Sequence, residues 1–131
     1  MNGRRQYEKS YLAMVRGSAD GRVSRVKYHA KTLDVYFDRW LGICRYENTF
    51  SDSILENTLF LVIEVASSIA AKDVGRLNAG HDEIRMAWAR YAECLKRLKD
   101  DPSGLKTRVE QTSELLKEFR RTCDEAFGRS S

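Results

Sequence analysis

The sequence predicts an all-α protein, an antiparallel four-helix bundle preceded by a basic arm. Three observations lead to this prediction. Apolar side chains recur at steps of three and four over most of the chain, which places them on one side of a helix. The 131 residues include one proline, so long helices are not interrupted. A chain of this length can also bury a core as one domain. We expect residues 1–23 to form the arm and residues 24–128 the bundle.

The first long helix is expected to begin near Ser24 and to end near Glu47 or Asn48. Its apolar residues follow one stripe: Val26, Ala30, Leu33, Phe37, Trp40 and Cys44. His29 lies off this stripe, where a histidine is usually a solvated polar residue. In the arm before this helix, Tyr7 to Val15 has the spacing of one short amphipathic helix.

The second helix opens at residues 51–53, where Ser53 and Glu56 match a capping box. Its main stripe comprises Leu55, Leu59, Val62, Ala66 and Ile69, while Leu61, Ile63 and Val65 make it apolar nearly all round. Such a helix lies either at the centre of the bundle or against another copy of the protein. Glu56 and Glu64 share one face over two turns, either as paired acids or as edge residues in water or against an arginine.

The third helix is expected to span Asp73 to Lys99, after a turn at residues 70–73. Asp73 is a candidate cap, and the stripe continues through Leu77, His81, Ile84, Trp88, Tyr91, Leu95 and Leu98. Gly75 and Gly80 are weak points in this helix. Residues 100–104 stop it, with Asp101 as the next cap and Pro102 at the first helical position. The fourth helix then carries Leu105, Val109, Thr112, Leu116, Phe119, Cys123 and Ala126 on one stripe and closes at Phe127 and Gly128.

The formal charge of +4 is unevenly distributed. Residues 1–31 carry eight basic and two acidic side chains, so the rest of the chain is slightly acidic. A basic segment ahead of a near-neutral bundle is typical of a protein that binds a polyanion, although a solvated tail has the same composition. The sequence shows no window of about 18 apolar residues and no signal-peptide run, so we expect a cytoplasmic protein without a membrane partner.

Signatures of enzymes are scarce. The chain has no glycine-rich phosphate loop and no Cys-x-x-Cys pair, and Cys44, Cys94 and Cys123 are far apart, so we expect no metal and no cofactor. Arg76 and His81 match the Arg-x4–6-His spacing of HEPN ribonucleases, and so do Arg22 and His29. One alternative is therefore a metal-independent endoribonuclease with Arg76 and His81 as catalytic residues at a dimer interface. The other interpretation of His81 is a core histidine satisfied by a neighbour.

Four stretches carry a resemblance to a known family. They are KTLDVYFDRWLGI at residues 31–43, ILENTLFLVIEVASSIAA at 54–71, GRLNAGHDEIRMAWARYAECLKRL at 75–98 and SELLKEFRRTCDEAF at 113–127. In apolar pattern and helix length the chain resembles the four-helix-bundle family that includes the accessory variability determinant (Avd) proteins of diversity-generating retroelements and the proteins encoded in ribosomal RNA intervening sequences. The resemblance covers about three quarters of the chain.

The resemblance implies a non-enzymatic accessory protein that binds RNA or DNA with little sequence preference. It also implies a homopentamer that associates with a reverse transcriptase. Under this hypothesis, basic residues of the arm and of the bundle contact the nucleic acid: Arg4, Arg5, Lys9, Arg16, Arg22, Arg25, Lys27, Arg85, Arg90, Arg97, Lys117, Arg120 and Arg121. The last three of these residues are expected to form an exposed cluster. A third hypothesis is a protein-only adaptor whose second helix binds a partner helix.

Overall fold

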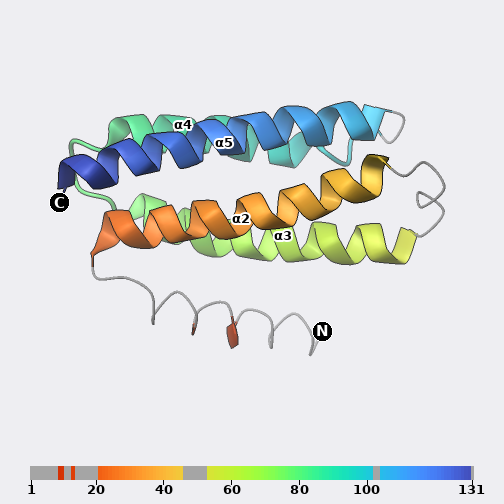
Figure 1. Cartoon of the computed structure of the whole chain (residues 1–131), viewed down its shortest axis with the longest axis horizontal. Helices are drawn as coiled ribbons and strands as arrows, with labels where there is room; N and C mark the ends of the chain where they lie inside the picture. Colours follow the sequence, from red (N-terminus) through yellow and green to blue (C-terminus); the bar gives the residue numbers. More distant parts are fainter. Residues whose placement is uncertain (1–8, 11–12, 14–20, 46–52, 102–103, 131) are drawn as a thin grey trace.

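A computed structural model describes residues 9–10, 13, 21–45, 53–101 and 104–130 of the chain. Its long helices are α2 (Arg22–Arg45), α3 (Ser53–Gly75), α4 (Asp82–Arg97) and α5 (Leu105–Ser130). Successive helices run in opposite directions, with α2 and α3 in one layer and α4 and α5 in the other (Figure 1). The predicted four-helix bundle is therefore confirmed. Of the predicted arm, residues 1–23, the structure describes Lys9, Ser10, Ala13 and residues 21–23, and Arg22 and Val23 already belong to α2.

The core of the bundle is built around a chain of aromatic rings. Phe37 of α2 lies 6.0 Å from the ring of Tyr91 of α4, and Trp88 stacks obliquely on Tyr91 at 5.0 Å and against Phe119 of α5 at 5.2 Å. These rings are all buried, as are the predicted stripe residues of the first helix. Their burial removes the apolar stripes from water, which is the main term that stabilises such a bundle.

The orientation of α3 differs from the prediction at its start, although Ala66 and Ile69 of the predicted stripe are buried. Leu55, expected on the inner stripe, is 47% exposed, whereas Phe60 and Ile63 face the core. The cause is the composition of α3, because a helix that is apolar nearly all round carries no periodic signal that selects its inner face. The helix packs extensively on α2 and only slightly on α4, so much of its surface stays outside the core.

The predicted helix from Asp73 to Lys99 is wrong at its start. Asp73 is not a cap: it lies buried in the last turn of α3, and the chain turns at residues 76–81 before α4 begins at Asp82. Gly80 supplies the reason, because its φ of +104° is a conformation that other residues rarely adopt. The turn therefore follows Gly75 and includes Gly80, the two predicted weak points, and does not lie at residues 70–73.

The other ends of the helices lie near their expected positions. α2 begins two residues before Ser24, and α5 begins at Leu105, three residues after the predicted first helical position at Pro102. A turn in which the Gly104 N–H donates to the Asp101 carbonyl at 3.1 Å precedes α5. The end expected for the first helix at Glu47 or Asn48, the Ser53 side chain of the capping box and Pro102 all fall outside the described residues.

One described helix is long and apolar enough to cross a membrane by length and composition alone. It is the Ile54–Gly75 part of α3, with a mean hydropathy of 1.6 over its most apolar window. This corrects the expectation that no such window exists. A core helix of a bundle passes the same test, and 39% of that window is buried against the other helices.

Candidate nucleic-acid interface

A buried histidine and aspartate join α2 to the end of α3. Nε2 of His29 lies 2.6 Å from Oδ2 of Asp73, and the His29 side chain is fully buried. Arg25, one turn earlier on α2, donates from Nε to the same carboxylate oxygen at 3.3 Å, and Arg76 approaches Oδ1 at 3.6 Å. The buried Asp73 carboxylate is therefore surrounded by donors, as a buried charge requires.

Burial lowers the pKa of His29 below its ordinary value of 6.5, although the Asp73 carboxylate acts in the opposite direction. The imidazole is therefore neutral at pH 7 and donates its Nε2–H to the carboxylate. His29 is not the solvated residue predicted from its position off the stripe. It also has no access to a phosphate, which excludes the Arg22–His29 match as a site of RNA cleavage.

Two further arginines hold the turn between α3 and α4. Arg22 donates from Nη1 to the carbonyl of Arg76 and to Oδ1 of Asn78, each at 3.0 Å. From the opposite side, Arg85 donates to the carbonyls of Leu77 and Asn78. These bonds satisfy carbonyls left without helical partners where α3 ends. The turn is thus fixed by cations that the sequence indicated as contacts for nucleic acid.

Arg76 and His81, the residues of the ribonuclease alternative, lie at the two ends of this turn. The Arg76 side chain is 68% exposed and its guanidinium approaches Asp73. His81 is half-buried at the N-cap position of α4, where its side chain makes no capping bond, and its Nδ1 is a buried atom without a hydrogen-bond partner among the described residues. The turn brings these residues to one end of the bundle.

Most of the basic residues expected to bind nucleic acid are paired with carboxylates of the bundle. Seven of the nine that lie in the described helices form such ion pairs: Arg25, Lys27, Arg85, Arg90, Arg97, Lys117 and Arg120. Arg22 binds the turn instead, and Arg121 is exposed without an ion pair in the described part of the chain. A paired cation contributes less to the field felt by a phosphate than a free one does.

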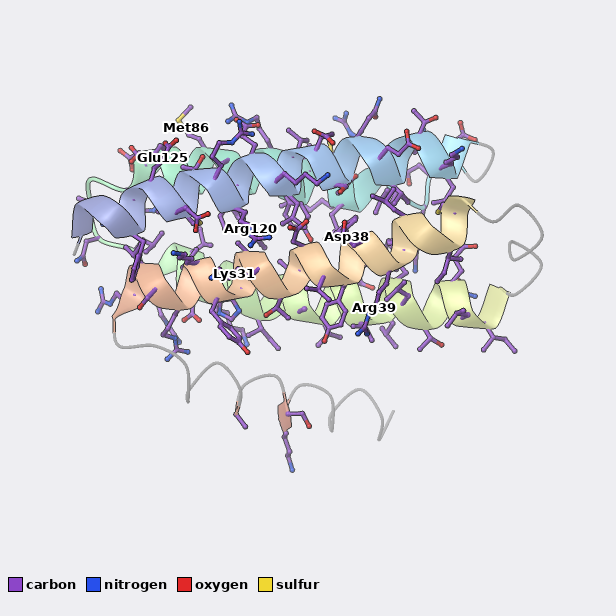
Figure 2. The ribbon with its side chains drawn as sticks, viewed as in Figure 1. Lys31, Asp38, Arg39, Met86, Arg120 and Glu125 are labelled. Carbon is purple, nitrogen blue, oxygen red and sulfur yellow. The ribbon has the colours of Figure 1, made fainter. Side chains whose placement is uncertain are left out.

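The predicted exposed cluster of Lys117, Arg120 and Arg121 is wrong for Arg120. Its guanidinium Nη1 lies 2.6 Å from Oδ2 of Asp34, whose carboxylate is buried between α2 and α5. Asp34 and Arg120 are 86 positions apart, so their pairing follows from helix packing and not from local sequence. Figure 2 shows Arg120 pointing from α5 toward α2.

The charge count of the bundle agrees with this pairing. Residues 24–128 contain 17 basic and 17 acidic side chains, so the formal charge of +4 belongs to residues 1–23 and to Arg129. Arg25, Lys27 and Lys31, counted with the basic front of the chain in the sequence, belong to α2. The excess positive charge is therefore confined to the arm and the last residues of the chain.

The cysteines and carboxylates give no sign of reactive or metal chemistry within the described residues. Burial raises the pKa of the Cys44 thiol to about 11 and that of Cys123 to about 12, so both stay protonated near neutral pH. Cys94 is half-buried and also free. Across the described ranges, no three His, Cys, Asp or Glu side chains gather in a way that could hold a metal ion.

Comparisons of the chain with protein-family models, with curated proteins and with solved structures find no match.

Proposed function

We propose that this protein is a non-enzymatic accessory protein that binds RNA or DNA through its basic arm and works as an oligomer in the cytoplasm. The proposal takes its partner, a reverse transcriptase of a diversity-generating retroelement, from the resemblance to the Avd family. It assigns the nucleic-acid contacts to Arg4, Arg5, Lys9 and Arg16 of the arm rather than to the paired cations of the helices.

One observation carries the proposal: the bundle is electrically neutral while the arm is not. An arm whose cations have few acidic neighbours in sequence releases counterions when phosphates replace them. The arm continues directly into α2, whose first residue, Arg22, lies beside the exposed Arg76. At this end of the bundle Arg22 donates to the turn and Arg76 approaches Asp73, so the contacts are assigned to the cations of the arm.

The test compares two variants with the same loss of charge. In the first, Arg4, Arg5, Lys9 and Arg16 are each changed to glutamine; in the second, Arg90, Arg97, Lys117 and Arg121 are changed to glutamine. Binding of a fluorescent single-stranded RNA is measured by anisotropy over a series of salt concentrations. We expect the arm variant to bind weakly, with a salt slope lower by roughly one for each cation that contacts a phosphate. The bundle variant should bind nearly as the unchanged protein does.

Equal weakening of the two variants would contradict the assignment to the arm. Binding that does not depend on salt, or no binding at all, would contradict the nucleic-acid function and favour the adaptor hypothesis. The same RNA, analysed on a gel after incubation, tests the ribonuclease alternative. Cleavage that is lost in His81→Ala, with the helical content unchanged, would replace the accessory function by an enzymatic one.

A further inference from the structure

A continuous groove runs between α3 and α4, on the side of the bundle where the two helices cover each other least. A cavity of about 410 Å³ lies between the two helices, and a second of about 290 Å³ continues it past the end of α4, where Leu98, Trp40 of α2 and Leu105 of α5 also line it; Phe60 and Lys99 border both. Its apolar wall includes Phe60, Trp88 and Leu95. Small residues such as Ser67 and Ala71 keep the α3 side low, so side chains of another helix have room to enter.

The two rims of this groove carry opposite charges. Glu56 and Glu64 belong to α3, Lys96 belongs to the last turn of α4, and Lys99 follows that helix. Glu64 borders the same cavity as Lys96, whereas Glu56 borders the cavity that ends at Lys99. None of the four forms an ion pair within the described residues; the Lys99 ammonium instead lies 4.1 Å from the centre of the Phe60 ring. The rims thus present an acidic line facing a basic line, and none of the four residues forms an ion pair in the described part of the chain.

This arrangement complements itself under only one kind of two-fold rotation. A rotation axis that runs along the groove, in the plane of the interface, carries α3 of one copy over α4 of the other. Glu56 and Glu64 of each copy then face Lys99 and Lys96 of the second copy. An axis perpendicular to the groove would instead set α3 against α3 and the carboxylates against each other.

We propose that the α3–α4 groove is the surface through which two copies of this chain associate, side by side and in parallel, about a two-fold axis along the groove. The proposed function requires that copies of the chain associate but does not say through which surface. The groove would be that surface, and it rests on the proposed function only for this requirement. It gives two copies, not the five that the family resemblance implies.

The experiment reverses each rim separately. One variant carries Glu56→Lys and Glu64→Lys, the other Lys96→Glu and Lys99→Glu. Mass in solution is measured by light scattering after chromatography in low salt. We expect two chains for the unchanged protein and one chain for each variant alone, because all facing rims then have the same sign. An equimolar mixture of the two variants should regain the mass of two chains, since every lysine rim then meets a glutamate rim.

Matched controls carry the same change of charge on the other side of the bundle. Asp38→Lys with Glu125→Lys, and Lys31→Glu with Arg39→Glu, alter exposed residues of α2 and α5 (Figure 2). Both should keep the mass of two chains. Circular dichroism of every variant checks that the helices remain, and three of the four rim residues are exposed enough for the changes to be tolerated.

An unchanged protein of one chain, or of five, would overturn the inference, as would a mixture of the rim variants that stays at one chain. Nucleic-acid binding is read out separately in the same samples. Rim variants that are single chains and still bind RNA normally would support both statements independently: that the groove is the surface of self-association, and that the arm binds the nucleic acid. Failure of RNA binding by the unchanged protein, with two chains confirmed, would reject the proposed function and leave the interface intact.

Discussion

The two sides of the bundle differ in how completely their helices cover one another. Between α2 and α5 the helices pack closely, and charged residues there meet partners on the facing helix, as in Lys27–Asp124 and Arg120–Asp34. Between α3 and α4 the packing is slight, a groove remains, and Glu56, Glu64, Lys96 and Lys99 along it form no ion pairs in the described residues. The charged side chains therefore have two roles. Between α2 and α5 they join the facing helices, whereas along the groove between α3 and α4 they lie on an exposed surface.

The comparison also explains where buried polar groups occur. Asp34, His29 and Asp73 all lie along α2 or against it, and each finds a charged or hydrogen-bonding partner on another helix. Ser67 and Tyr91 are the corresponding buried pair between α3 and α4, with their hydroxyl oxygens 2.6 Å apart. A neutral pair of this kind fixes the relative position of α3 and α4 with less cost of desolvation than an ion pair has.

The largest expected difference between the sides is in core packing. Phe37→Ala should lower the free energy of unfolding by about 4 kcal/mol, because a fully buried ring between Trp40 and Tyr91 is replaced by a cavity. Leu61→Ala on the open side of α3 should change it by less than about 0.5 kcal/mol at concentrations where the protein is monomeric. Urea unfolding followed by circular dichroism measures both. Similar losses for the two variants would show that α3 is covered in the single chain.

Removing the Asp73 carboxylate should have the next largest effect. Asp73→Ala leaves the buried His29 and Arg25 without their shared acceptor and should cost about 3 kcal/mol. Asp73→Asn keeps an oxygen that accepts the His29 N–H and should cost about half as much. Thermal unfolding of the two variants gives the comparison. Equal stability of Asp73→Ala and the unchanged protein would mean that the cluster does not hold α2 to α3.

A smaller loss is expected at the pair between α2 and α5. Arg120→Ala leaves the buried Asp34 carboxylate without its charged partner, and we expect a cost of about 2 kcal/mol. Arg90→Ala is the matched control, since its ion pair with Glu118 joins α4 to α5 but lies exposed, and its loss should cost less than about 0.5 kcal/mol. The difference between the two in urea unfolding separates structural arginines from surface ones.

The helical stripes could be predicted because their residues are separated by polar positions. Val26 to Cys44 on α2 and Val109 to Ala126 on α5 lie inside the bundle as the spacing indicated. α3 could be oriented only in part, with Ala66 and Ile69 buried as predicted and Leu55 exposed, since its outer positions are apolar too. The predicted position of the turn is wrong because the sequence around Asp73 fits a helix N-cap, whereas in the structure the Asp73 carboxylate is buried and bonded to His29. Only the neighbouring helix α2 distinguishes these two roles of Asp73.

The candidate site was less predictable than the fold. A sequence gives the sign of each charge but not its partner, so Arg120 and Arg85 were counted as free cations although Asp34 and the turn carbonyls take them. The balance of charge over residues 24–128 was available and pointed to a bundle that neutralises itself. His29 gave a weaker signal: its place next to the buried stripe residue Ala30 was compatible with burial as well as with solvent.

The smallest effect that we predict is a dependence of the free energy of unfolding on pH. It comes from the buried His29–Asp73 pair, which joins α2 to the end of α3. Burial holds the pKa of His29 below 6.5, so the unfolded chain takes up a proton at this residue at a higher pH than the folded chain does. The contribution of His29 to the free energy of unfolding is therefore complete above pH 6.5 and is lost as the pH falls from there through the lowered pKa of the folded state.

His29→Gln keeps a hydrogen-bond donor for Asp73 but does not titrate, so it isolates this term. The difference in the free energy of unfolding between the unchanged protein and His29→Gln should shrink as the pH is lowered from about 7.5 to about 5. Urea unfolding at each pH measures it, with the protein dilute enough to be monomeric. A difference that stays constant, or that grows in acid, would mean that the folded protein binds the proton at least as well as the unfolded chain. The His29–Asp73 pair would then be ionic rather than a neutral histidine donating to a carboxylate.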